Sequence, residues 1–432
     1  MQIAIFYNNV NQYLINGDTV LKVRSEYTRL LDRPSRSGNS KCKFGAEYDL
    51  YWNRNAMLKV YLFTKESDFI VQEIFNCRKL SVDKRLQPRV LKKGSFVHFT
   101  LLKKNISTLD SLKIAADHFK ISEKEIGCCV LKDEYAITVQ MISAPYKKGM
   151  VSEYKFKKFI LKNGVSSDKP LTITMHSGNY FTIIIKLKSN ALANAIKLRK
   201  KLAFIRKKGL PNFYGVQRFG DNGINHLIGK AILFRDRDYA AKIWLTNLYY
   251  KSKIGTSIWE NWGNWKKCMN IASNIHDWQV QSFLKRLDQN GDDCLDCFRS
   301  IPLGRFFIRS YSSYLFNLVL PKRLRDKNEV NTNLPILVYK TKASDLSGTY
   351  KQLISREKIT LDMFKFKEYD NLTNEGSLRT SIFYPKNITL RKSTAKTLSL
   401  SFSNQSGSFV TVMLEFLFNY NYVKDSVCGT HV

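Results

Sequence analysis

Hydrophobic and polar positions alternate along several short stretches of the chain. Residues 136–143 place Ile137, Val139 and Met141 on one side and small or polar residues on the other, and this alternation is typical of a β-strand. Further strands are predicted at residues 171–175, 180–187 and 397–402, and the continuous apolar runs 128–131 and 409–417 are interpreted as buried strands. The predicted strands 397–402 and 409–417 would form a C-terminal hairpin that could complete the sheet of the first domain.

A helical period replaces this alternation in two places. Apolar residues recur at helical spacing from Leu109 to Phe119, behind Ser107, whose side chain suits an N-cap. A strongly basic helix is predicted from Ala191 to Lys208. Strands and helices together indicate an α+β protein.

Composition changes near residue 237. The segment from Arg237 to about Phe366 is more helical and contains all the tryptophans except Trp52, which suggests a second domain inserted into the first. We therefore expect an N-terminal extension without a functional motif, a first domain, an inserted domain and a C-terminal return to the first domain, at residues 1–56, 57–236, 237–385 and 386–432.

The chain carries a large excess of positive charge. Its 70 lysine and arginine residues exceed its 36 aspartate and glutamate residues, which gives a formal net charge of +34. Because the excess is spread along the chain, a polyanion is the expected partner. A hydrophobic content of 44% permits substantial cores and excludes a disordered basic coat.

Other features exclude further classes of protein. No apolar run approaches about 18 uncharged residues, which argues against a membrane span, and the first residues do not resemble a secretory signal. Eight cysteines are too sparse for a disulfide scaffold and favour a reducing intracellular compartment, cytoplasmic or nuclear. Cys294 and Cys297 form a C-x-x-C pair without a second pair of ligands, so we expect no metal.

One aspartate has a position that suits chemistry. Asp133 lies in the connection between the predicted strands 128–131 and 136–143, where rigid flanks would hold it facing a cleft, as for many active-site carboxylates. The alternative is that Lys132, Asp133 and Glu134 form only a polar hairpin turn. The local pattern leaves both interpretations open.

Several separated segments resemble, in the same order, the motifs of the TruD family of pseudouridine synthases. They are Ser67–Ile74, Leu102–Thr108, Ile126–Gln140, His176–Thr182, Pro211–Gly220, Arg309–Asn317, Gly376–Arg379 and Ser406–Thr411. The most specific, Pro211–Gly220, reads P-N-F-Y-G-V-Q-R-F-G and is close to the family's P-N-Y-F-G-x-Q-R-F-G. Together they span roughly residues 57–418, and their shared order makes coincidence improbable.

This resemblance implies a fold and a reaction. The fold would be α+β, of the pseudouridine-synthase type, with a mixed, mainly antiparallel sheet in the catalytic domain and an α+β TRUD domain at residues 237–385. The reaction would convert a uridine to pseudouridine by breaking the N-glycosidic bond, rotating the base and rejoining it through carbon, with no cofactor. The implied substrate is RNA, in particular tRNA at uridine 13, and the protein is expected to be a monomer.

The resemblance also assigns roles to residues. Asp133 matches the catalytic aspartate, which acts as a nucleophile or a general base. A uridine in folded RNA must be flipped out, which requires stacking and polar groups around it. The expected substrate-binding residues are Asn212, Tyr214, Phe409, Phe69, Arg218, Thr138 and Gln140.

Some of these residues have structural alternatives. Phe409 is as well explained by a core position as by base stacking. Arg218 is either a buried structural arginine or a group that orients the Asp133 carboxylate. Gln140 is expected to brace the loop. Lys132 would either lower the pKa of the carboxyl or point to solvent.

The basic helix leads directly into the Asn212 motif, which favours contact with RNA phosphates. The residues expected to bind the RNA backbone are Lys200, Lys201, Arg206, Lys207 and Lys208. The alternative is an ordinary solvated helix face.

The chain also departs from the family pattern. A lysine usually lies five residues before the Asp-Phe pair, and this chain has Phe63 there. Val130 replaces a small residue, and Glu134 replaces a basic one. These changes keep a second hypothesis open, a non-catalytic RNA-binding protein with the synthase fold. A nuclease or glycosidase is weaker, because nothing places Asp133 and Glu134 on opposite sides of a substrate.

Overall fold

The structure is a computed structural model in which two compact units are described. The described residues are 60–62, 64–84, 86–92, 94–187, 191–220, 223–248, 253–273, 278–290, 298, 304–325, 333–366 and 378–418. The first unit contains those up to residue 210 and from 383 onward, and the second contains those from 211 to 382. The first unit is therefore assembled from two separate parts of the chain. The domain division expected from composition stays a prediction.

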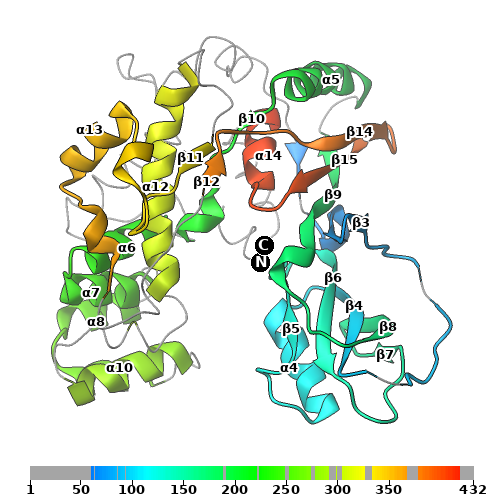
Figure 1. Ribbon diagram of the computed structural model, residues 1–432, viewed down its shortest axis with the longest axis horizontal. Helices are drawn as coiled ribbons and strands as arrows, with labels where there is room; N and C mark the ends of the chain where they lie inside the picture. The colour runs from blue at the N-terminus through cyan, green and yellow to red at the C-terminus, as the bar shows by residue number, and fades with distance from the viewer. Residues whose placement is uncertain are drawn as a thin grey trace. The chain divides into compact units, whose positions relative to one another are not determined.

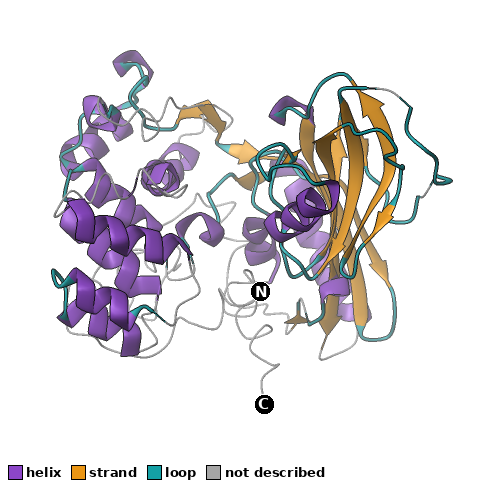
Figure 2. Cartoon of the chain, turned by 90° about the horizontal axis from the view of Figure 1, so that it is seen from below, coloured by secondary structure: helices purple, strands orange, loops and turns teal. Residues whose placement is uncertain are grey.

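An eleven-stranded sheet forms the centre of the first unit (Figures 1 and 2). Its main path runs β14-β15-β9-β2-β6-β4-β8-β7, with β1 paired to β9, β3 to β2 and β5 to β6. The strands are β1 (Val60–Tyr61), β2 (Phe69–Phe75), β3 (Arg78–Lys79), β4 (Phe96–Lys104), β5 (Gly127–Cys128), β6 (Ile137–Pro145), β7 (Tyr154–Lys155), β8 (Phe159–Ser167), β9 (His176–Leu187), β14 (Lys386–Lys392) and β15 (Thr397–Gln405). Strands β2 and β6 run parallel, and the other pairs on this path are antiparallel. The mixed, mainly antiparallel sheet is confirmed.

Strand β15 joins this sheet far from its neighbour in sequence. It pairs with β9 along its whole length, with Leu400 opposite Ile183 and Asn404 opposite Asn179. In Figure 1 the green β9 and the orange-red β15 lie side by side. The C-terminal part of the chain therefore completes the sheet, as expected.

Three helices accompany the sheet: α4 (Thr108–Phe119), α5 (Ala191–Lys208) and α14 (Val410–Phe418). The Ser107 side chain accepts a hydrogen bond from the Asp110 N–H and so caps α4. The apolar face of α4, including Leu112, packs in one buried cluster with Phe99 and Leu101 of β4. This packing fixes the start of α4 beside the loop that carries Asp133.

The second unit is mainly helical. Its helices are α6 (Asn225–Leu233), α7 (Arg237–Leu248), α8 (Lys253–Glu260), α9 (Trp265–Ile271), α10 (Trp278–Asn290), α12 (Gly304–Arg325) and α13 (Gly348–Glu357). Strands β11 (Asn333–Pro335) and β12 (Leu378–Thr380) form a two-stranded sheet, and β10 (Leu210–Pro211) pairs with β13 (Ile382–Phe383) where the chain passes between the units. Helices α6 and α12 approach each other closely at Gly229. A Cβ atom at this position would overlap the main chain of Phe307, so the contact requires glycine.

Helices α4 and α5 lie where the sequence predicts them, but three predicted strands differ. Residues 409–417 are mostly the helix α14, whose residues are all buried. A fully apolar run carries no period that separates a buried strand from a buried helix. The hairpin partner of β15 is instead the preceding strand β14. The run 128–131 is extended only to Cys128, and residues 173–175 form a 3-10 turn.

Membrane-spanning helices and metal-binding groups can be assessed only for the residues that the structure describes. Among the helices of the described ranges, none is long and apolar enough to cross a membrane. Within the same ranges, no group of three or more His, Cys, Asp or Glu residues could hold a metal ion. Cys294 and Cys297 lie outside the described residues.

Candidate active site

Asp133 lies on the loop between β5 and β6 and is partly buried. Strand β4, which pairs with β6, anchors this loop, because the Lys103 ammonium donates to the main-chain oxygen of Asp133 at 2.6 Å. It also donates to the Ile106 carbonyl at 2.8 Å, and Lys103 itself is fully buried. A buried cation therefore holds the peptide of the proposed catalytic residue.

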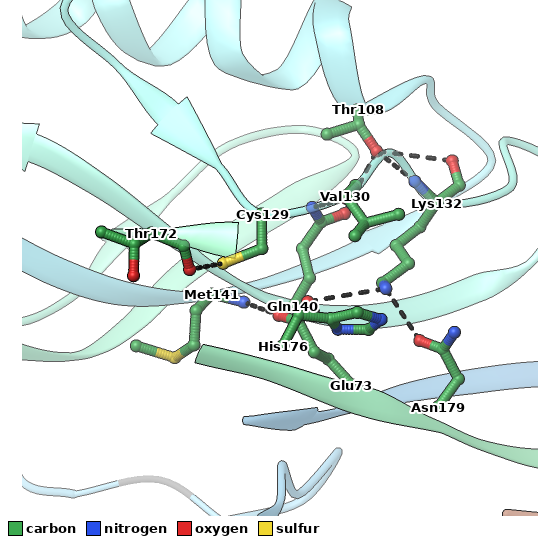
Figure 3. A network of polar contacts seen from close by, with 10 residues as sticks. All are labelled: Glu73, Thr108, Cys129, Val130, Lys132, Gln140, Met141, Thr172, His176 and Asn179. Carbon is green, nitrogen blue, oxygen red and sulfur yellow. Dashed lines mark hydrogen bonds and ion pairs between the residues drawn. The ribbon is translucent and has the colours of Figure 1, made fainter. Parts of the chain in front are cut away.

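Lys132 anchors the loop from the other side. Its ammonium donates to Asn179 Oδ1 at 2.7 Å and lies 3.5 Å from Glu73 Oε1. The Lys132 side chain is only 3% exposed, so the solvent-facing alternative is wrong. Figure 3 shows the lysine reaching from the loop to the strands below it.

Glu73, in β2, is the centre of this buried polar network. Its Oε2 accepts a hydrogen bond from the Met141 N–H at 2.6 Å, and its Oε1 lies 2.9 Å from His176 Nδ1. Together with Lys132, these contacts join β2, β6 and β9 to the loop (Figure 3). Since an uncompensated buried charge is costly, the Glu73–Lys132 pair restricts where the loop can lie.

Gln140 and Thr138 lie on the same face of β6 and are fully buried. The Gln140 amide donates to the Val130 carbonyl at 3.0 Å and accepts from the Thr108 hydroxyl at 3.1 Å. Thr108 also accepts a hydrogen bond from the Lys132 N–H at 3.1 Å. Gln140 thus braces the loop from below, through the first turn of α4 (Figure 3).

Burial and the neighbouring positive charges have opposite effects on the pKa of Asp133. Burial raises the pKa of the Asp133 carboxyl, whereas the positive charges of Lys103 and Lys132 lower it, and the net direction is upward. Burial lowers the pKa of Lys103 to about 8, against the opposing effect of the carboxylates of Asp133 and Glu134. Burial also lowers the pKa of Lys132. Two desolvated cations therefore favour the ionised form of a carboxyl that burial disfavours.

The two phenylalanines assigned to the first unit differ in exposure. Phe69 is 1% exposed and stacks on Phe181 with ring centroids 6.1 Å apart, and Phe181 in turn lies against Phe402. Phe69 thus belongs to the core beneath the polar network. Phe409 is partly buried, immediately before α14.

Asn212 belongs to the second unit and is buried. Its Nδ2 donates to the main-chain oxygen and the hydroxyl of Thr380, each at 3.0 Å. Its Oδ1 accepts from the Arg379 guanidinium at 2.7 Å. The asparagine side chain therefore ties its own turn to β12.

Tyr214 and Arg218 lie close to this turn. The Arg379 guanidinium is 4.0 Å from the centre of the Tyr214 ring, and that of Arg218 is 5.2 Å from it. Arg218 also donates to the Ser313 hydroxyl at 3.2 Å, and burial lowers its pKa. Asn317 fixes Tyr214 by accepting its N–H at 2.9 Å and donating to its carbonyl at 3.0 Å. Asn212, Tyr214 and Arg218 thus form one cluster.

The basic helix α5 contains two kinds of cation. Lys200 and Lys207 are exposed. Lys201 donates to the carbonyls of Phe416 and Leu417, and Arg206, although it is exposed, donates to that of Ile388. Part of the positive charge of this helix therefore binds main-chain oxygens within its own unit.

Four residues of the network were not selected from the sequence: Lys103, Glu73, Asn179 and His176. All four lie inside motif segments that resemble the family, and His176 begins the segment that contains Asn179. Their role depends on strand register, which a single sequence does not give. Phe63, which replaces a lysine of the family pattern, lies outside the described residues.

Comparisons with known proteins identify the family of this chain. A family model described as tRNA pseudouridine synthase D (TruD) matches residues 47–343. A probable tRNA pseudouridine synthase D of Nanoarchaeum equitans is 30% identical over 358 residues, which cover 75% of this chain and 87% of that protein. The tRNA pseudouridine synthase D of Aquifex aeolicus is 26% identical over 390 residues, covering 82% of this chain and 97% of that protein.

A solved structure supports the fold. The crystal structure of a putative tRNA pseudouridine synthase D from Methanosarcina mazei matches with a TM-score of 0.62 at 20% identity. The match covers 88% of this chain and 99% of that one. The resemblance found in the sequence motifs is confirmed, and the chain belongs to the tRNA pseudouridine synthase D (TruD) family.

Proposed function

We propose that this chain isomerises a uridine of tRNA to pseudouridine and that Asp133 performs the chemistry. Membership of the family supports the reaction. The observation that supports the residue is the anchoring of its loop, with Lys103 on the Asp133 peptide and Lys132 on Glu73. A loop whose main chain is held this way needs little reorganisation when charge develops on the substrate.

The reaction requires one bond to break and another to form. The bond between N1 of uracil and C1′ of ribose breaks, the base turns, and C5 bonds to C1′ while C5 loses a proton and N1 gains one. Asp133 would act on the ribose or the base as nucleophile or general base. The positive charges of the two buried lysines would favour its ionised form and so oppose the upward shift of its pKa that burial causes.

Base recognition is proposed for residues that the family resemblance assigns to substrate binding. Asn212 and Tyr214 match the asparagine and the aromatic that flank the target base in the family, and Phe409 matches an aromatic on the hairpin side of the cleft. Arg218 and Thr138 are proposed as further substrate-binding residues. In the free protein the Asn212 amide is occupied by Thr380 and Arg379. Its proposed contact with a base would therefore require an exchange of hydrogen bonds.

The substrate position is proposed to be uridine 13 of tRNA, as the family resemblance implies. Exposed lysines of α5, Lys200 and Lys207, would contact the phosphate backbone nearby. Mapping pseudouridine along a complete tRNA transcript tests this position. Modification of a different uridine would overturn the position and leave the reaction intact.

The deciding assay treats a tRNA transcript with wild-type protein and no added metal, followed by carbodiimide mapping. Wild type should form pseudouridine, and Asp133→Asn should form none while binding the transcript equally well. Asp117→Asn, an exposed aspartate on α4, is the matched control and should keep full activity. If the wild type binds tRNA without modifying it, the non-catalytic alternative holds. If Asp133→Asn retains activity, the assignment of the catalytic residue is wrong.

A further inference from the structure

A row of polar side chains crosses one face of the sheet in the first unit. Asn404 of β15 lies opposite Asn179 of β9, and Asn179 lies opposite Glu73 of β2. Residues directly opposite in paired strands present their side chains on the same face. The three side chains therefore form one line across neighbouring strands.

This line reaches the loop that carries Asp133. Lys132, its neighbour in sequence, donates to Asn179 Oδ1 at 2.7 Å and lies 3.5 Å from Glu73 Oε1. Asn404 is thus one strand away from a residue that contacts the catalytic loop. It is also five residues before Phe409 in the chain.

Asn404 is the member of this row whose side chain has no partner. It is 3% exposed, and neither Oδ1 nor Nδ2 has a hydrogen-bond partner among the described residues. Buried amides are almost always hydrogen-bonded, because loss of water is otherwise uncompensated. The Thr411 hydroxyl, at the start of α14 and 2% exposed, also has no hydrogen-bond partner among the described residues.

An unpaired amide suits the edge of a nucleobase. It offers one donor and one acceptor side by side, and uracil offers the N3–H donor beside the O4 acceptor. Two parallel hydrogen bonds can form between such groups, as between an asparagine and adenine. Enzymes that act on a flipped base read its edge in this way.

We infer that Asn404 binds the flipped uracil, with Nδ2 donating to O4 and Oδ1 accepting from N3–H. This inference rests on the proposed function and deepens it, because it names a base-binding residue outside the positions assigned from motifs. The binding of substrate would satisfy an amide that the free protein leaves unpaired.

The first test compares Asn404→Leu and Asn404→Ala with wild type on a tRNA transcript under single-turnover conditions. Leucine has the same branching but no polar atoms, and alanine removes the amide without adding volume. Both should lower kcat/KM by about 10- to 100-fold, the effect of leaving buried polar groups of the base unpaired. Ser399→Ala, on the other face of the same strand, is the matched control and should equal wild type.

Thermal unfolding of the free proteins separates binding from structure. Because the amide has no hydrogen-bond partner among the residues that the structure describes, Asn404→Leu should unfold at a temperature no lower than wild type. An asparagine that held the fold together would instead lower it. If the leucine variant does not fold, the alanine variant carries the same comparison.

The second test changes the substrate. A tRNA with 4-thiouridine at the target replaces O4 by a weaker acceptor, and nucleoside chromatography detects the C-glycoside. Wild type should convert it about 10-fold more slowly than the uridine tRNA, whereas the Asn404 variants should convert both at one reduced rate.

The outcomes are distinct. Wild-type kinetics in both Asn404 variants would overturn the inference and leave the proposed function standing. The inference would also be overturned if both Asn404 variants unfolded at a lower temperature than wild type and still discriminated against the 4-thiouridine tRNA as strongly as wild type. The amide would then stabilise the fold without contacting O4. An inactive wild type would refute the proposed function itself, and the inference with it.

Discussion

Replacing Lys103 with methionine would remove a charge that the fold holds in its interior. The ammonium donates to the carbonyls of Ile106 and Asp133 at 2.8 and 2.6 Å. Burial lowers its pKa from 10.5 to about 8. Protonating Lys103 at pH 7 therefore costs the folded state about 3 kcal/mol relative to the unfolded chain. Methionine avoids this cost but leaves two carbonyls without their donor.

The lowered pKa sets the sign of the pH dependence. Between about pH 8 and 10.5 the unfolded chain keeps a proton that the folded protein has released, so the free energy of unfolding rises with pH there. From pH 7 to 9.5 the wild type should gain about 2 kcal/mol relative to Lys103→Met. Titrating groups that do not interact with Lys103 occur unchanged in both proteins and cancel in this difference.

Urea unfolding at pH 7 and 9.5, followed by far-UV circular dichroism, measures this gain in the unit that contains Lys103. The matched control is Lys104→Met, because Lys104 follows on the same strand but is 59% exposed and pairs with Glu66 at the surface. The control should show the pH dependence of wild type. Parallel curves for wild type and Lys103→Met would refute the reasoning.

The same variant should change the activity profile. Lys103 lowers the pKa of the Asp133 carboxyl, so its loss should move the acid limb of kcat/KM to higher pH. An unmoved acid limb would separate Lys103 from the charge state of the aspartate.

Three further predictions follow from the contacts. Glu73→Gln should lower the free energy of unfolding by about 3 kcal/mol, because its lysine partner stays buried. Glu66→Gln, which removes one partner of a surface pair, should lower it by under about 1 kcal/mol. Equal losses of the two variants in urea unfolding would contradict this prediction. Lys200→Ala and Lys207→Ala should each reduce the salt slope of tRNA binding by about one, as titrations at several salt concentrations would show. Lys201→Ala should instead lower the unfolding temperature, with little effect on the salt slope, because this lysine donates to carbonyls at the end of α14. A change of the salt slope as large as that of Lys200→Ala would show that Lys201 contacts the RNA.

The sequence predicts the elements around the site better than the contacts within it. The period of two over 136–143 and the capped helix behind Ser107 both appear in the structure, because their patterns are local. The apolar run of α14 has no such period, so the sequence alone does not distinguish a buried helix from a buried strand there. The Glu73 network depends on the register of β2 against β6 and β9. No local pattern marks Asn404, because whether its amide finds a partner depends on the three-dimensional packing around it.

The pairing of β9 with β15 also affects how the protein is made. Ile183 contacts Leu400 across more than two hundred residues of intervening chain. While a ribosome synthesises that chain, at roughly 5–20 residues per second, one edge of β9 lacks its partner for about ten seconds or more. An unpaired strand edge invites pairing with other nascent chains. The second unit can fold during this interval, whereas the proposed active site is complete only after the last strand is made.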